Sequence, residues 1–124
     1  MLNISVDEWL DKETGEAVLL VSDNDINFLV FCPCYMEKDR KKISLDSLFS
    51  EDIILEDDIP KIEKDETGGF FAYTVVAKVI STKPPCVELT DSINIDLDCA
   101  FPGDIEKGQM VRFRTRRLSL EDWL

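Results

Sequence analysis

The chain has 124 residues, and 26 acidic against 14 basic side chains give it a formal net charge of -12 at pH 7. This balance repels phosphate backbones and anionic lipid surfaces, and it favours a basic partner. No histidine is present, which excludes Ser-His-Asp and Cys-His catalysis and histidine-containing zinc sites. We therefore expect no enzymatic activity and no cofactor.

The length predicts one domain over residues 1–124, large enough to bury a core. The first residues lack a basic region followed by an apolar stretch, so we expect no signal peptide. The longest apolar run, residues 28–34, is too short to cross a membrane. We expect a cytoplasmic protein whose four cysteines are reduced, with no membrane partner.

Two patterns compete at the start of the chain. Ser5 and Glu8 have the spacing of a helix capping box, and Ile4 and Trp9 occupy the flanking positions of a hydrophobic staple. Residues 11–15, DKETG, instead form a good hairpin turn with glycine at the position that needs a positive φ. The capping pattern favours a short helical turn here.

The next segments read as a hairpin and a further helical turn. Residues 17–22 and 26–34 are apolar, β-branched runs separated by the turn residues 23–25, and together they predict a β-hairpin. In residues 44–50, SLDSLFS, the apolar side chains recur at i, i+3 and i+4, which predicts one or two helical turns.

The acidic stretch of residues 51–66 is expected to be a loop broken by Pro60. It ends an acidic N-terminal part, residues 1–66, made of the hairpin and the helical pieces. We expect the acidic side chains of this stretch to form one exposed face, and these are Glu51, Asp52, Glu56, Asp57, Asp58, Glu63, Asp65 and Glu66.

The last 55 residues predict a small barrel. They contain one long apolar segment and three shorter alternating ones, separated by three turns of which two contain Gly or Pro: residues 70–81, 87–89, 93–97 and 110–116. This order is similar in pattern to five-stranded barrels of the OB or SH3 type. The expected fold is therefore all-β or β-dominated α+β: a small antiparallel barrel over residues 70–124, with an N-terminal hairpin and short helical turns.

The C-terminal residues 118–124, LSLEDWL, nearly repeat the capping pattern of residues 4–10. We expect a short capped turn that places Trp123 over the core, because large apolar groups are usually buried. An exposed linear motif at residues 121–124 is the alternative.

The leading functional hypothesis is non-catalytic binding. The acidic face of residues 51–66 is expected to engage a basic protein, since opposite charge attracts such a partner. Small acidic proteins that neutralise a toxin or inhibit an enzyme have a similar size and charge balance. The alternative without a partner is that the acidity only keeps the protein soluble.

A second hypothesis is an OB-like module that binds nucleic acid. On a strand, Arg112, Arg114 and Arg116 would share one face, and Arg117 follows them. Such a row can follow a nucleic-acid backbone. The overall charge opposes this, and we expect nucleic acid to be an unlikely partner.

A third hypothesis is a metal site of four cysteines. Cys32 and Cys34 flank Pro33, and Cys86 and Cys99 could complete a Cys₄ set for zinc. The second pair lacks the close spacing that marks such sites, so we favour Cys-Pro-Cys as the end of a buried strand and expect no metal.

Overall fold

The computed structural model describes residues 1–121, and within this range all regular structure is strand. The strands are β1 (Asn3–Asp11), β2 (Glu16–Asp23), β3 (Ile26–Cys32), β4 (Ile43–Leu48), β5 (Glu51–Leu55), β6 (Lys61–Lys64), β7 (Tyr73–Thr82), β8 (Pro85–Thr90), β9 (Ile93–Leu97), β10 (Met110–Thr115) and β11 (Arg117–Ser119). The prediction of a β-dominated chain is confirmed. The short helical turns are wrong, because the described residues contain none.

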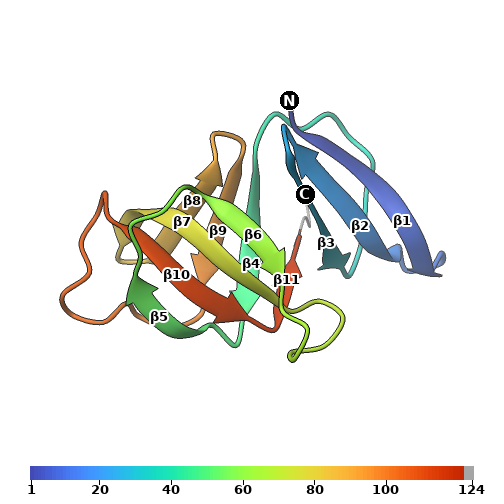
Figure 1. Cartoon of the computed structure of the whole chain (residues 1–124). Coiled ribbons are helices and arrows are strands. Elements are labelled where there is room, and N and C mark those ends of the chain that lie inside the picture. Colours follow the sequence, from blue (N-terminus) through green and yellow to red (C-terminus); the bar gives the residue numbers. More distant parts are fainter. Residues whose placement is uncertain (122–124) are drawn as a thin grey trace.

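The strands of the described residues form one mixed sheet in the order β1-β2-β3-β11-β4-β9-β8-β7-β10-β5, and β6 pairs with β7 beside this path. Most neighbours are antiparallel, but β4 with β9 and β3 with β11 are parallel. The sheet is open, with β1 and β5 at its ends, so a closed antiparallel barrel is not what residues 1–121 form. In Figure 1 the hairpin strands β1 to β3 lie to one side and the curved strands β5 to β10 to the other.

The N-terminal segment is a strand, not a helical turn. Ile4 and Val6 are half-buried between exposed neighbours, which is the period-two pattern of a strand. β1 pairs with β2 along almost its whole length, and this pairing overrides the local capping signal. The competing hairpin turn is confirmed: Gly15 has φ +84°, and Asp11 Oδ1 accepts the Glu13 amide at 2.9 Å.

Residues 44–50 are also strand rather than helix. In β4 the buried residues are Ile43, Leu45 and Ser47, so the burial alternates. The helical pattern grouped Phe49 with Leu45 and Leu48 on one apolar face, but 66% of Phe49 is exposed. β4 pairs with β9 over five residues, which gives its backbone a long-range partner.

The acidic stretch is partly strand, which corrects the expected loop. β5 pairs with β10, and β6 pairs with β7. The predicted hairpin of β2 and β3 and the strand that becomes β7 are confirmed, although β7 begins at Tyr73 rather than residue 70.

One hydrophobic core joins the two parts of the sequence. It contains Leu19 and Val30 from the hairpin together with Val75, Ile95 and Phe113 from the later strands, all fully buried. Residues 1–121 include no helix long and apolar enough to cross a membrane.

Candidate functional site

The acidic stretch of residues 51–66 lies beside β10, the strand that carries Arg112 and Arg114 and is called the arginine strand below. β10 runs between β5 and β7, and Arg112 and Arg114 are opposite Ile54 and Glu51 of β5. Val111, Phe113 and Thr115 of β10 are buried, so Arg112 and Arg114 share the outer face as the sequence predicted. The acidic stretch and the first two arginines therefore share one surface.

Arg114 is bound by the acidic stretch. Its Nε and Nη2 donate to Asp65 Oδ2 at 3.1 and 3.0 Å, and its Nη1 donates to Asp52 Oδ2 at 3.2 Å. Hydrogen bonds from the Thr67 hydroxyl and amide, and then from Arg114, lower the pKa of Asp65 to about 2. Arg114 thus links β10 to β5 and to the loop after β6, and its charge is neutralised.

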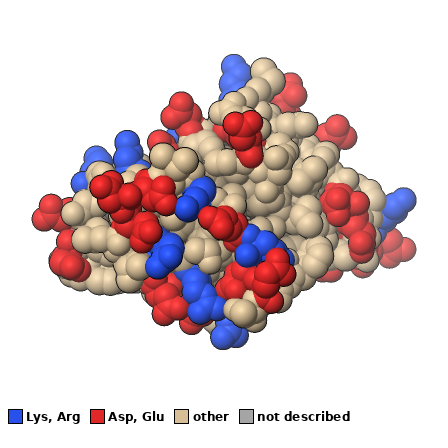
Figure 2. Space-filling view, viewed as in Figure 1, with Lys and Arg blue, Asp and Glu red and all other residues tan. Residues whose placement is uncertain are grey.

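Other carboxylates of the stretch are paired as well. Arg112 Nε lies 3.9 Å from Glu56 Oε2, and Lys61 Nζ lies 2.8 Å from Asp58 Oδ2 and 3.6 Å from Glu63 Oε1. The Lys61 side chain, hydrogen-bonded to Asp58, lowers the pKa of that carboxyl. Figure 2 shows the result: acidic and basic side chains interleave over the half of the molecule that holds β5, β6 and β10.

Three carboxylates of the stretch remain unpaired. Glu51, Asp57 and Glu66 are exposed and form no ion pair within 4 Å in the described part of the chain. Large apolar side chains are exposed in the same stretch: 43% of Ile54 and 73% of Ile59. The surface combines carboxylates outside direct ion pairs with exposed hydrocarbon.

The last two arginines lie beyond the end of β10. Arg116 follows the end of β10, is exposed, and has its guanidinium carbon 5.5 Å from the centre of the Phe49 ring. Arg117 is half-buried in β11 and lies 4.7 Å from the Phe31 ring centre. The four arginines do not form one exposed cationic track.

The cysteines are not brought together. Cys32 ends β3 and is buried, Cys34 follows half-buried, Cys86 is buried in β8, and the Cys99 thiol donates to the Ser50 carbonyl at 3.5 Å. No group of three or more Cys, Asp or Glu side chains in residues 1–121 could hold a metal ion. The interpretation of Cys-Pro-Cys as a strand end is confirmed, since β3 stops at the residue before Pro33.

No local sequence pattern indicated how the turn between β4 and β5 is held. Asp98, after β9, accepts the Phe49 amide at 2.6 Å and the Ser50 amide at 3.0 Å. Burial opposes ionisation of Asp98, but these backbone hydrogen bonds outweigh it and lower its pKa. The contact joins residues about fifty positions apart, which no local pattern reports.

Two shallow hollows flank the arginine strand. One, of about 240 Å³, is lined by Glu51, Asp65, Thr67, Gly68, Arg114, Thr115 and Arg116. The other, of about 280 Å³, is lined by Glu56, Lys61, Glu63, Lys64, Thr74, Val76 and Arg112.

The expected turn and the alternative linear motif at the C-terminus involve Asp122, Trp123 and Leu124, which lie outside the described residues.

Comparison with known proteins found no match for this chain. The chain matches no protein-family model, no curated protein and no solved structure.

Proposed function

We propose that this chain is a non-catalytic binding protein whose surface of residues 51–66 engages a basic protein in the cytoplasm. The single observation that carries the proposal is the group of exposed carboxylates without an ion pair, Glu51, Asp57 and Glu66. Neutralisation of a toxin or inhibition of a basic enzyme is the role that fits a small acidic protein of this kind.

Charge supports a basic partner over an acidic one. The stretch contains eight carboxylates, and the cations in it and beside it are Lys61, Lys64, Arg112, Arg114 and Arg116. Lys64 donates to the carbonyl oxygens of Gly69 and Ala72 and keeps its positive charge, so five cations face eight carboxylates and the surface stays net acidic. The negative electrostatic potential that remains steers a cationic protein toward this surface.

The exposed hydrocarbon supports a protein as the partner. Protein interfaces combine an apolar centre with a polar rim, and 45% of Leu55 and 73% of Ile59 are exposed among the carboxylates. Nucleic acid is disfavoured because Arg112 and Arg114 already face carboxylates. We expect no binding of a single-stranded oligonucleotide even at low salt.

The test is affinity capture followed by calorimetry with the recovered partner. The variant Glu51→Lys/Asp57→Lys/Glu66→Lys reverses three unpaired charges and should raise Kd about tenfold or more at 0.15 M salt. Raising the salt should weaken wild-type binding, because exposed charges are screened.

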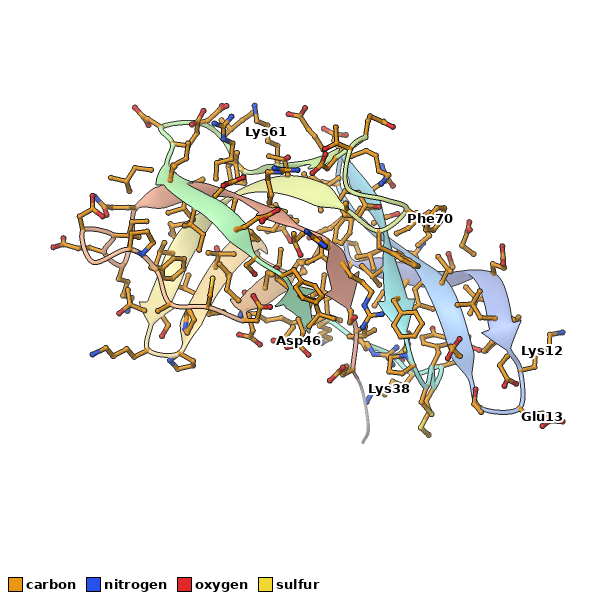
Figure 3. The ribbon with its side chains drawn as sticks, turned by 90° about the horizontal axis from the view of Figure 1, so that it is seen from below. Lys12, Glu13, Lys38, Asp46, Lys61 and Phe70 are labelled. Carbon is orange, nitrogen blue, oxygen red and sulfur yellow. The ribbon has the colours of Figure 1, made fainter. Side chains whose placement is uncertain are left out.

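A matched control separates the surface from net charge alone. Asp7→Lys/Glu8→Lys/Glu13→Lys makes the same charge change on the β1–β2 hairpin, where Figure 3 places Glu13 at the end of the molecule away from Lys61. Its Kd should change less than about threefold. Equal effects of the two triple variants, or recovery of no basic partner, would contradict the proposal.

A further inference from the structure

Phe49 has an unusual combination of backbone and side-chain states. Its φ is +57°, a region that bulky side chains rarely adopt, and 66% of the residue is exposed. Within residues 1–121 the other non-glycine residues with positive φ are Asn24 and Asp52, whose types tolerate this region. Neither backbone preference nor burial in the core explains a phenylalanine at position 49.

The backbone around Phe49 is held in place by distant residues. Asp98 accepts the amides of both Phe49 and Ser50, and the Arg116 amide donates to the Leu48 carbonyl at 3.1 Å. The exposed ring is therefore presented on a fixed turn. A backbone segment fixed before binding loses little conformational freedom when a partner arrives.

The groups next to Phe49 suit a cation. Phe49 is two residues from Glu51, which lines the 240 Å³ hollow and has no ion pair within 4 Å among the described residues. The Arg116 guanidinium carbon lies over the Phe49 ring, 5.5 Å from its centre, so this ring already accepts a cation within the chain. An aromatic face beside an unpaired carboxylate binds the hydrocarbon stem and the charged head of lysine or arginine.

We propose that Phe49 is the anchor of the interface and that it receives an arginine or lysine side chain of the basic partner, whose cation reaches Glu51. This inference rests on the proposed function and names the contact at its centre. A second copy of this chain is disfavoured as the occupant, because two chains of net charge -12 repel each other. Aromatic residues dominate binding at such centres.

The first experiment compares two substitutions with the recovered partner. Phe49→Ala and Phe49→Gly both remove the ring and should raise Kd at least tenfold, mainly through faster dissociation. Glycine relieves the positive φ and alanine does not, so Phe49→Gly should melt about 2–4 °C above Phe49→Ala. Loss of binding without loss of folding separates an anchor from a structural residue.

Asn24→Gly is the matched control for backbone strain. Asn24 has φ +56° in the turn between β2 and β3, away from the acidic stretch, so its Kd should equal that of wild type. Wild-type affinity in the Phe49 variants would overturn the anchor. If the charge-reversal variant still weakened binding, the proposed function would survive that result, and if neither change mattered, both ideas would fail.

The second experiment needs no partner. The peptide acetyl-Gly-Arg-Gly-amide is titrated into labelled protein and compared with the uncharged citrulline peptide by amide chemical shifts. The arginine peptide should move the amides of residues 49–51 at least threefold more than the citrulline peptide, and Phe49→Ala should abolish the difference. Equal shifts with both peptides, or shifts that persist in Phe49→Ala, would overturn the proposal.

Discussion

Thr115 connects the arginine strand to the turn that carries Phe49, and its hydroxyl can be removed almost without changing shape. Thr115 and Ser47 are each 1% exposed, and Ser47 Oγ donates to Thr115 Oγ1 at 2.7 Å. The Thr115 hydroxyl in turn faces the carbonyl oxygens of Leu48 and Arg117 at 3.2 and 3.1 Å. Thr115→Val replaces this hydroxyl with a methyl group.

The expected cost follows from which partners keep a hydrogen bond. Ser47 retains its contact with the Ser50 hydroxyl at 2.7 Å, and the Leu48 carbonyl still accepts the Arg116 amide. The full penalty of an unsatisfied buried group is therefore avoided, and the loss should be about 1–2 kcal/mol, the range of one or two net hydrogen bonds. For a chain of this length that corresponds to about 3–8 °C in Tm.

Urea unfolding of Thr115→Val, Ser47→Ala and the double variant measures the coupling. The double variant should be less destabilised than the sum of the singles by about 0.5–1.5 kcal/mol, because the shared hydrogen bond is lost only once. Thr74→Val, on the adjacent strand β7, is the control, since no described residue hydrogen-bonds its side chain, and it should stay within about 0.5 kcal/mol. If the double variant lost as much stability as the two single variants together, the coupling between Ser47 and Thr115 would be refuted.

Three further predictions concern the loop after β6 and the thiols. The pKa of Asp65 is about 2 in the folded state, so its contribution to stability is present above its ordinary pKa of 3.8 and is lost as pH falls toward 2; Asp65→Asn should flatten stability between about pH 4 and 2 in acid titrations followed by circular dichroism. Gly68→Ala should cost about 1–3 kcal/mol in urea unfolding, because an added Cβ would lie 2.5 Å from the nearest side-chain atom, whereas Gly103→Ala, with no atom within 4 Å, should cost little beyond backbone effects. Cys34 should react with a thiol reagent before Cys86, whose burial raises its pKa to about 12 and which should react only on unfolding.

The strands of the C-terminal part could be predicted because their signals are local. β7 and β9 show apolar runs or strict alternation between turn residues, and both form where expected. The segments that became β1 and β4 carried local helix signals, but each found a long-range strand partner. The parallel pairing of β4 with β9 depends on contacts some fifty residues apart, which local patterns do not contain.

The site could be predicted only in its components. The sequence identified the acidic residues and the arginines as competing surfaces, because it could not show that β5 pairs with β10. It grouped Phe49 with Leu45 and Leu48 in a helical turn, whereas a positive φ and hydrogen bonds to a carboxylate after β9 hold its backbone in the turn after a strand. Both errors concern tertiary pairing rather than residue chemistry.

The pairing of β5 with β10 determines which arginine variants can test recognition. Arg114 binds Asp65 and also Asp52, a residue of β5 with φ +55°, so its removal would disturb the edge strand and the loop together. Weaker binding in an Arg114 variant would therefore report local structure as much as recognition. Arg116 is exposed, and its guanidinium forms no ion pair in the described part of the chain, so Arg116→Ala is the variant that isolates a cationic contribution. Because removing Arg116 takes a cation from beside Phe49, the basic partner should bind this variant at least as tightly as wild type, whereas a nucleic-acid ligand would bind it more weakly.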